Sequence, residues 1–195
     1  MIGIKLPVSA DEIRTLKAGD EVSITGVMVT ARDAAHKYLV ETDGEDVRDV
    51  LKDSMIYHCG PVVRKDESGE YSFVAAGPTT SIREEPYEAP VIEKYGVRGV
   101  IGKGGMGAKT LEACGEFGSV YLSALGGLAT TLAQSVVEVL DVKKLEEFGV
   151  PEAFWVIRVE NFPAIVTMDS HGRSLHDEIA ELSKGNYERL LKGGR

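Results

Sequence analysis

Two loops that each follow a short apolar segment carry residues that could bind a small anion. Thr79 and Arg83 lie in the run GPTTSIR, and Lys103 lies in the run GKGGMG. The glycines leave backbone N–H groups uncovered, and the arginine, the lysine and the threonine hydroxyl would add charged and polar donors. This combination suits a small carboxylate better than a nucleotide.

The known nucleotide-binding motifs do not account for these loops. GKGGMG has neither the GxxxxGK[ST] spacing of a Walker loop nor the GxGxxG spacing of a dinucleotide-binding turn. A further candidate, Arg32, is expected in the first turn of a helix that follows an apolar strand. Each residue also has a plainer interpretation, because Gly-Pro-Thr-Thr commonly forms only a turn and most arginines are solvated.

The composition of the chain limits its possible partners. The 195 residues carry a formal net charge of −9, so the surface as a whole would repel nucleic acid and anionic membranes. No apolar run reaches the roughly 18 residues of a membrane-spanning helix, and the first residues do not resemble a signal peptide. We therefore expect a cytoplasmic protein that binds neither nucleic acid nor membrane.

The cysteines and histidines do not predict a metal site. The two cysteines, Cys59 and Cys114, have no C-x-x-C partner, so we expect both to be buried and neither to hold a cluster. The four histidines are scattered along the sequence. His36 could orient Arg32 from one helical turn away or be a partly buried helix residue, and His58 is expected to be structural.

The elements that must position these residues indicate a single layered α/β domain with a mixed sheet. Consecutive strands and a KDESG turn early in the chain predict an antiparallel hairpin, and the later alternation of helix and strand predicts parallel pairing. We expect helices near residues 9–16, 32–41, 89–95, 108–117, 128–134 and 175–191, and strands near residues 22–29, 55–63, 71–76, 97–101, 120–122, 136–142, 154–159 and 164–168.

Several local details of these elements are also predicted. Ser9 and Glu12 have the spacing of a capping box, and Gly26 suggests a bulge within its strand. The run 160–163 is expected to be a hairpin turn between the last two strands. The apolar stripe of the final helix is expected to pack on the sheet.

Five segments of the sequence resemble one enzyme family in order and in rough spacing. The chain is similar to the iron–sulfur hydro-lyases of the class I fumarase and tartrate dehydratase group, and specifically to their C-terminal domain or separate β subunit. The segments are ARDAAHKY (31–38), YHCGPVV (57–63), AAGPTTSIR (75–83), GVIGKGGMG (99–107) and FWVIRVENFPAIVTMDSHG (154–172). The resemblance covers nearly all of residues 1–195 and implies a swivelling β/β/α domain.

The resemblance also implies roles for individual residues. Arg32, Arg83 and Lys103 match residues that bind the carboxylates of the substrate, and Thr79 matches the residue proposed as the catalytic base. A [4Fe–4S] cluster would be bound by a partner α subunit and not by this chain. The chain would then be inactive alone and would act in a hetero-oligomer.

Several functions remain open at this point. The first is the β subunit of a fumarate hydratase that interconverts fumarate and (S)-malate, and the second is the β subunit of an L-tartrate dehydratase. A dicarboxylate-binding module without catalysis and a scaffold subunit are further alternatives. For the enzyme, we expect an exposed apolar patch near the loops of Thr79 and Lys103, where the α subunit would dock.

Overall fold

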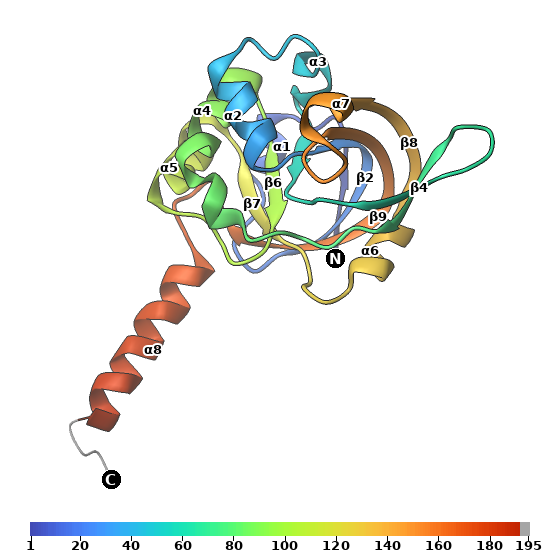
Figure 1. The fold of residues 1–195 in the computed structure, drawn as a ribbon. Helices are drawn as coiled ribbons and strands as arrows, with labels where there is room; N and C mark the ends of the chain where they lie inside the picture. Colours follow the sequence, from blue (N-terminus) through green and yellow to red (C-terminus); the bar gives the residue numbers. More distant parts are fainter. Residues whose placement is uncertain (192–195) are drawn as a thin grey trace.

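A seven-stranded sheet is the central element of the protein in this computed structural model, which describes residues 1–191 (Figure 1). Its strands lie in the order β1-β2-β3-β6-β7-β9-β8, and β2 also pairs with β9. The five strands from β2 to β9 in this order therefore close on themselves. The strands are β1 (Ile2–Lys5), β2 (Glu21–Thr30), β3 (Met55–Tyr57), β6 (Gly99–Gly102), β7 (Val120–Ser123), β8 (Val136–Lys143) and β9 (Phe154–Met168).

Strand direction makes the sheet mixed, as the sequence predicts. β1, β2, β3, β6 and β7 pair in parallel, whereas β9 runs antiparallel to β2, β7 and β8. The carboxyl ends of parallel neighbours lie at the same edge of a sheet. The segments that follow β2, β3 and β6 are therefore brought together at one edge.

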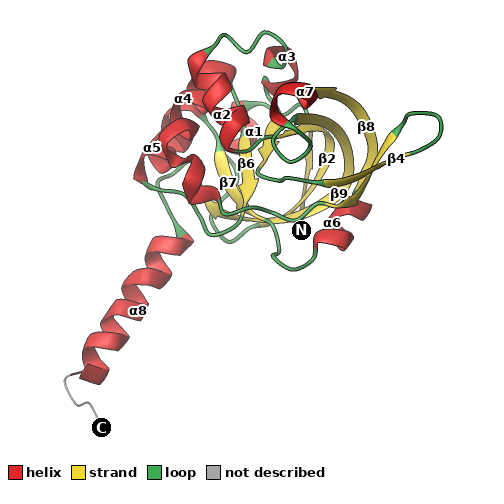
Figure 2. Ribbon diagram, viewed as in Figure 1, coloured by secondary structure: helices red, strands yellow, loops and turns green. Residues whose placement is uncertain are grey.

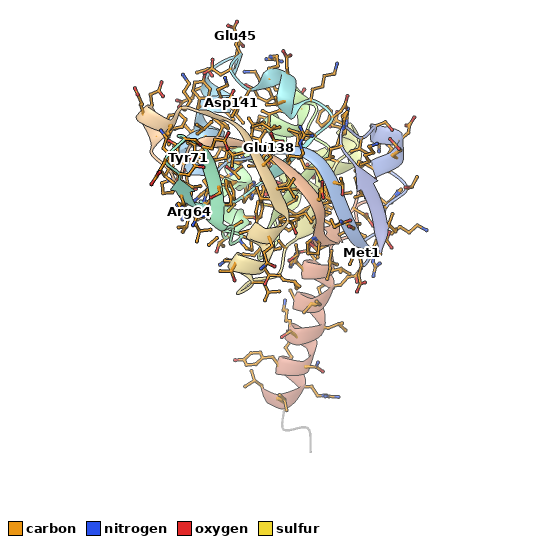
Figure 3. The ribbon with its side chains drawn as sticks, turned by 90° about the vertical axis from the view of Figure 1, so that its right-hand side faces the viewer. Met1, Glu45, Arg64, Tyr71, Glu138 and Asp141 are labelled. Carbon is orange, nitrogen blue, oxygen red and sulfur yellow. The ribbon has the colours of Figure 1, made fainter. Side chains whose placement is uncertain are left out.

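A separate hairpin is formed by β4 (Val62–Lys65) and β5 (Tyr71–Ala75). Asp66 closes its turn by accepting hydrogen bonds from the backbone N–H groups of Ser68 and Glu70, both at 2.9 Å. The predicted antiparallel element is confirmed. Arg64 and Tyr71 mark this hairpin at the side of the molecule in Figure 3.

Three helices cover one side of the sheet, and α4 packs between α2 and α5 (Figure 2). The Pro86 ring lies in the first turn of α4, where a missing N–H costs no helical hydrogen bond. Helix α4 therefore begins four residues before the predicted start at residue 89. The helices are α1 (Ala10–Ile13), α2 (Asp33–Glu41), α3 (Arg48–Leu51), η1 (Ser81–Glu84), α4 (Glu85–Tyr95), α5 (Ala108–Phe117), α6 (Ala129–Gln134), α7 (Leu145–Phe148) and α8 (Leu175–Leu191).

Two apolar cores lie on the two faces of the closed strands. Tyr57 and Trp155 belong to the core inside the closed strands, whereas Ile56 and Phe154 belong to the core beneath the helices. Neighbouring residues on one strand serve different cores because successive side chains point to opposite faces. This alternation accounts for strands that are buried on both sides.

Two local predictions at the start of the chain are confirmed. Ser9 and Glu12 form the capping box of α1, with the backbone N–H of each residue bonded to the side chain of the other. In β2, the register with β9 shifts between Ile24 and Gly26. Gly26 has φ +138°, a backbone conformation that residues with a Cβ rarely adopt.

The predicted hairpin at residues 160–163 is wrong, because β9 is one continuous strand. Phe162 and Pro163 pair with Ile24 and Ser23 of β2, so the segment lies in the sheet. The polar and proline residues mark the irregularity opposite the β2 bulge, where Asn161 has φ +51°. A bulge and a turn have similar sequence signals, and only the pairing partner distinguishes them.

Helix α8 contradicts the expectation that the last helix packs on the sheet. None of its residues is buried, and Leu182 is 70% exposed. The helix extends away from the body of the protein in Figure 1. Within residues 1–191, no helix is both long and apolar enough to cross a lipid bilayer.

Candidate functional site

The segments after β2, β3 and β6 are joined side by side at the carboxyl edge of the sheet. The backbone N–H of Ala31 donates to the Tyr57 carbonyl at 3.0 Å, and that of His58 donates to the Ile101 carbonyl at 2.7 Å. These bonds continue the parallel ladder beyond the strands. Side chains at the ends of three strands therefore project from one edge.

The GPTT loop fills the space between the ends of β3 and β6. The backbone N–H of Thr79 donates to the His58 carbonyl at 2.7 Å, and the N–H of Lys103 donates to the Thr79 carbonyl at 3.2 Å. The Thr79 hydroxyl also donates to the His58 carbonyl, at 3.0 Å. Backbone hydrogen bonds thus hold Thr79 and Lys103 next to each other.

Arg32 lies at the same edge, directly before α2. Its guanidinium rests on Gly60, where an added Cβ would come within 2.5 Å of Arg32 Nη1. The same guanidinium forms an ion pair with Glu152 at 3.4 Å. The missing side chain of Gly60 therefore leaves room for the guanidinium, and a Cβ at this position would displace it.

Arg83 approaches this group through an ion pair with Asp33, the residue that follows Arg32. The four predicted residues are therefore brought to one edge of the sheet. Arg32 is 21% exposed and Arg83 is 56% exposed, and the Lys103 side chain is exposed as well. Three cations and one hydroxyl line an open surface that could receive an anion; the role of each residue toward a substrate stays a prediction.

The glycine-rich loop is not the open cradle that its sequence suggests. The Glu85 carboxylate accepts hydrogen bonds from the backbone N–H groups of Gly107, Lys109 and Thr110 at 2.7, 3.1 and 3.3 Å. It thus caps the N-terminus of α5 from within the chain. The N–H groups where this loop enters α5 are therefore occupied by Glu85 and are not free to bind an external anion.

Directly beneath the site lies a buried polar cluster that the sequence did not predict. One oxygen of Glu88 lies 3.1 Å from His36 Nε2 and 3.0 Å from His58 Nε2. The other ring nitrogen of His58 lies 2.9 Å from the Ser81 hydroxyl, which accepts a hydrogen bond from Tyr121 at 2.9 Å. All five side chains are buried.

The α4 pattern contained a signal for part of this cluster. Glu84, Glu88, Val91 and Tyr95 recur at helical spacing and are all buried. Carboxylates in line with an apolar stripe indicate buried charge that needs partners. The predicted helix began at residue 89, so it left out Glu84 and Glu88 and the buried carboxylates were not recognised.

The environment of the cluster shifts the pKa values of Glu88, His36 and His58 in different directions. Burial acts to raise the pKa of Glu88, but the charge and hydrogen bond of His36 and the hydrogen bond of His58 outweigh it and lower the pKa to about 2. Burial acts to lower the pKa of His36, but Glu88 and Glu84 raise it overall. Burial lowers the pKa of His58. Glu88 and His36 are thus charged, and His58 is neutral.

The cluster could also bind a metal ion, because His36 and His58 lie close together in the fold although they are far apart in the sequence. Within residues 1–191, donor atoms of His36, His58 and Glu88 lie within 4.8 Å of one another. The two histidine nitrogens both face a single carboxylate oxygen at hydrogen-bonding distance. Glu88 is hydrogen-bonded to His58 and ion-paired with His36, but His36 Nε2 and Glu88 Oε1 have no hydrogen-bond partner, so the contacts alone do not decide between an ion-pair cluster and a metal site.

The two cysteines do not form a cluster site. Cys59 and Cys114 are both buried, as expected, and both are free thiols. Burial raises the pKa of Cys59 to about 12 and raises the pKa of Cys114 as well. Metals and clusters bind the thiolate form, so neither residue is suited to ligate one.

Apolar residues surround part of the open edge. Ile82 lies in η1, between Thr79 and Arg83 in the sequence, and its side chain is exposed. Leu125 and Leu128 are exposed on the loop after β7, whose Ala124 N–H donates to the Gly102 carbonyl at 2.9 Å. We call Ile82, Leu125 and Leu128 the apolar rim. Its presence agrees with the expected patch near these loops.

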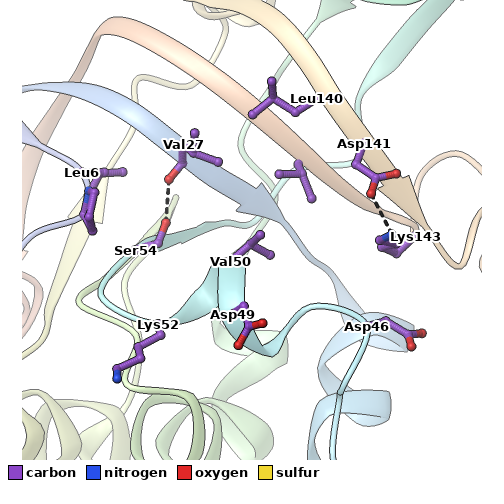
Figure 4. A pocket seen from close by; sticks show the side chains of 12 residues that line it. Leu6, Val27, Asp46, Asp49, Val50, Lys52, Ser54, Leu140, Asp141 and Lys143 are labelled. Carbon is purple, nitrogen blue, oxygen red and sulfur yellow. Dashed lines mark hydrogen bonds and ion pairs between the residues drawn. The ribbon is translucent and has the colours of Figure 1, made fainter.

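A hollow lies at the opposite end of β3, and the predicted residues are not part of its lining. It has a volume of about 490 Å³, and its lining includes Val27, Val50, Leu140 and Asp141. Figure 4 shows these side chains around it, with Ser54 bonded to the Val27 carbonyl at 2.7 Å. The convergent cations and the hydroxyl, and not the volume of a hollow, select the carboxyl edge as the candidate site.

Comparison with known proteins gives consistent results for nearly the whole chain. The family model described as "Fumarase C-terminus" matches residues 1–179. A putative fumarate hydratase class I from Geobacillus stearothermophilus is 51% identical over 190 residues, which are 97% of this chain but 36% of that protein. The chain therefore spans about a third of the length of this relative.

Two further relatives have nearly the same length as the matched region. A putative L(+)-tartrate dehydratase subunit beta from Methanocaldococcus jannaschii is 41% identical over 92% of this chain and 91% of its own. The L(+)-tartrate dehydratase subunit beta of Escherichia coli K12 is 40% identical over 94% of this chain and 89% of its own. The family match and these identities show that the chain belongs to the fumarase C-terminal family, whose members include hydro-lyases of the class I fumarate hydratase and tartrate dehydratase group.

Proposed function

We propose that this chain is the β subunit of a two-chain iron–sulfur hydro-lyase and that its main substrate pair is fumarate and (S)-malate. The observation that carries the proposal is the meeting of Arg32, Thr79, Arg83 and Lys103 at one edge of the sheet. In this proposal the closed strands with helices on one side form the swivelling β/β/α domain implied by the sequence.

Adding water to a double bond between two carboxylates requires that the substrate be held in one orientation. Arg32 and Arg83 can each bind a carboxylate with two parallel hydrogen bonds, which fixes direction as well as charge. Lys103 adds a third cation on the loop whose backbone is hydrogen-bonded to Thr79. Orientation is the larger contribution, because proton transfer depends on the placement of the reacting atoms.

The arginines must leave their present partners to bind a substrate. Arg83 is paired with Asp33, and Arg32 is paired with Glu152. The Arg83–Asp33 pair is the more exposed of the two, and an exposed ion pair contributes only about 0–1 kcal/mol. A dicarboxylate can therefore replace Asp33 at small cost, whereas the partly buried Arg32–Glu152 pair is more costly to replace.

Thr79 is proposed as the base that removes the C–H proton. A threonine hydroxyl is a weak base, so nearby cations or a further acidic group must favour its deprotonated form. The backbone of Lys103 is hydrogen-bonded to that of Thr79, and Arg83 lies in η1, which begins two residues after Thr79. In this proposal, an acidic group of the partner subunit completes the activation.

The [4Fe–4S] cluster of the proposed enzyme does not fit the residues of this chain. The only two thiols of the sequence are buried, and their pKa values are raised. The cluster is therefore assigned to the partner α subunit, where it would supply a Lewis acid for the hydroxyl group. The apolar rim of Ile82, Leu125 and Leu128 is the proposed contact surface for that subunit.

Co-expression with a cysteine-bearing α subunit from the same genome tests the proposal. The purified complex is expected to hydrate fumarate in an oxygen-sensitive reaction, and this chain alone is expected to be inactive. A complex without activity on fumarate or L-tartrate, or turnover by the chain alone, would contradict the proposal. Each preparation should be assayed anaerobically and after exposure to air.

L-tartrate dehydratase is the second candidate function. The two relatives whose length matches this chain are both named as its β subunit, whereas the fumarate hydratase relative is much longer. The ratio of kcat/KM for fumarate and L-tartrate in the same complex decides between them. A ratio in favour of L-tartrate would reassign the substrate and leave the roles of the four residues unchanged.

A non-catalytic dicarboxylate-binding module is the remaining alternative. The same cations would serve it, but the chain alone would then bind its ligand. Thermal unfolding of the isolated chain with and without malate distinguishes the two functions, because a bound ligand raises the unfolding temperature. We expect no increase for a half-site that needs its partner.

A further inference from the structure

We propose that Glu88 is a positioning residue that holds Arg32 and Thr79 in one fixed arrangement, acting through His36 on the first and through His58 on the second. This inference rests on the proposed function for its catalytic meaning. The connections themselves are properties of this chain and can be tested without activity.

The first connection runs from Glu88 to Arg32. Glu88 lies 3.1 Å from His36 Nε2, and His36 Nδ1 lies 3.0 Å from the carbonyl oxygen of Arg32. Arg32 is the N-cap residue of α2, at the point where the chain leaves the sheet. The imidazole therefore fixes the backbone that carries the guanidinium.

The second connection runs from Glu88 to Thr79. His58 Nε2 lies 3.0 Å from Glu88, and the His58 carbonyl accepts hydrogen bonds from both the backbone N–H and the hydroxyl of Thr79. Ser81 Oγ, at 2.9 Å from His58 Nδ1, holds the other side of the ring. A shift of His58 would therefore move the hydroxyl proposed as the base.

Hydrogen-bonding requirements define the protonation of both rings. The Arg32 carbonyl can only accept, so His36 Nδ1 must carry a proton. His36 Nε2 faces a carboxylate oxygen at 3.1 Å, but without the angle of a good hydrogen bond, so this contact acts mainly as an ion pair. Charge on His36 is therefore needed for the first connection.

His58, in contrast to His36, is neutral in this arrangement. Its Nε2 donates to Glu88, and its Nδ1 accepts from Ser81, whose oxygen in turn accepts from Tyr121. A second proton on this ring would oppose the charge of His36, with a ring centroid only 4.9 Å away. One carboxylate thus binds one imidazolium and one neutral imidazole.

Burial makes this support rigid. His36, His58, Ser81 and Glu88 are all excluded from solvent, and a buried pair that loses one member leaves an uncompensated charge. The other titratable groups near Glu88 and the two rings are Glu84, Cys114 and Tyr121. Glu84 faces His36 Nδ1 at 3.9 Å and would be the nearest alternative partner for the imidazolium.

Nitrogen NMR of the full chain with ¹⁵N-labelled histidine tests the protonation states. We expect both nitrogens of His36 to stay protonated to a higher pH than in a free histidine, and His58 to keep one bare nitrogen. A His36 ring that is neutral throughout, or that titrates as a free histidine does, would overturn the proposal.

The Glu88→Gln variant tests the connection to Thr79 without catalysis. It keeps the size of the side chain and removes the charge, and we expect amide hydrogen exchange at Thr79 to become faster. Glu93→Gln is the matched control, because Glu93 is an exposed residue on the same helix. Unchanged exchange in a folded Glu88→Gln chain would overturn the proposal.

Kinetics of the assembled complex test the catalytic meaning. We expect Glu88→Gln to lower kcat by about 10²-fold, the usual effect of misplacing a reacting group, and to change KM less. Glu93→Gln should leave both constants unchanged. A Glu88→Gln complex as active as the unmodified one would overturn the positioning role, whereas an inactive unmodified complex would instead contradict the proposed function.

Metal analysis separates the proposal from its main rival. Purified chain, prepared with and without added zinc, is expected to contain no stoichiometric metal dependent on Glu88. One metal ion per chain that is lost in Glu88→Gln would overturn the proposal and assign His36, His58 and Glu88 as ligands.

Discussion

The carboxyl edge of the sheet has two layers whose charged residues are held in different ways. In the outer layer, Arg32 and Arg83 pair with carboxylates at the surface and remain partly or largely exposed. In the inner layer, His36 and His58 share Glu88 and have no exposed surface. The outer partners can be exchanged for a ligand, whereas the inner partners cannot be exchanged for water.

This difference shows how one site can be both open and precise. A surface ion pair contributes little and is readily replaced. A buried pair is expensive to break, because its members lose hydration that nothing else restores. In the proposed reaction, the cations of the outer layer would change partners while the backbone beneath them stays fixed.

The largest expected effect concerns the hydroxyl at the boundary between the two layers. Thr79→Val keeps the shape of the side chain and removes the proposed base, so we expect kcat of the assembled complex to fall by about 10²- to 10⁴-fold. The neighbouring Thr80 is exposed and provides the control variant Thr80→Val. Equal losses for both variants would show that the loop, and not the Thr79 hydroxyl, matters.

The inner layer predicts a characteristic dependence of stability on pH. The pKa of Glu88 is lowered to about 2 from 4.5, so its contribution to the free energy of unfolding is present above about pH 4.5 and is lost as the pH falls toward 2. The pKa of His36 is raised, so the interaction between Glu88 and His36 is lost as the pH rises through the raised pKa of His36. The contribution is of order 3 kcal/mol.

Urea unfolding of the unmodified chain and of Glu88→Gln measures this contribution. The difference in unfolding free energy between the two chains should be largest between about pH 4.5 and pH 6.5 and smaller on either side. The control Glu93→Gln should track the unmodified chain at every pH. A difference that stays constant from well below about pH 4.5 to well above about pH 6.5 would show that Glu88 contributes by packing and not by charge.

In the outer layer, replacing Arg83 is expected to change substrate binding but not the free energy of unfolding. Arg83→Lys keeps the charge but loses the paired donors, and we expect KM of the complex to rise roughly tenfold. The free energy of unfolding should change by less than about 0.5 kcal/mol, because Arg83 is exposed. Arg64→Lys, on the hairpin in Figure 3, is the control for an exposed arginine outside the site.

The same contrast explains which parts of the structure could be predicted from the sequence. Local signals were reliable where a residue decides its own conformation, as in the capping box of Ser9 and Glu12 and the bulge at Gly26. The four candidate residues Arg32, Thr79, Arg83 and Lys103 were selected from sequence motifs and the family resemblance, and their roles stay predictions. Glu88 was missed because its partners, His36 and His58, are far away in the sequence.

The errors share one physical cause. Whether residues 160–163 form a turn or a bulge depends on β2, which lies more than a hundred positions earlier. Glu85 could occupy the glycine-rich loop only because α4 packs beside α5. Sequence patterns describe what a segment can do, but tertiary partners determine which of its possibilities is realised.

The smallest expected effect on the free energy of unfolding concerns α8. Its exposed apolar residues can be compared with buried apolar residues elsewhere in the protein. The stripe of Leu175, Ile179, Leu182 and Leu190 has the spacing of a core-facing helix, yet none of these residues is buried. We expect Leu182→Ala to change the free energy of unfolding of the isolated chain by less than about 0.5 kcal/mol. The control is Leu39→Ala in α2, where a fully buried leucine should cost about 2–5 kcal/mol. A cost for Leu182→Ala that matches the Leu39 value would mean that α8 packs against an apolar surface in solution, because only lost burial can make truncation of a leucine so expensive.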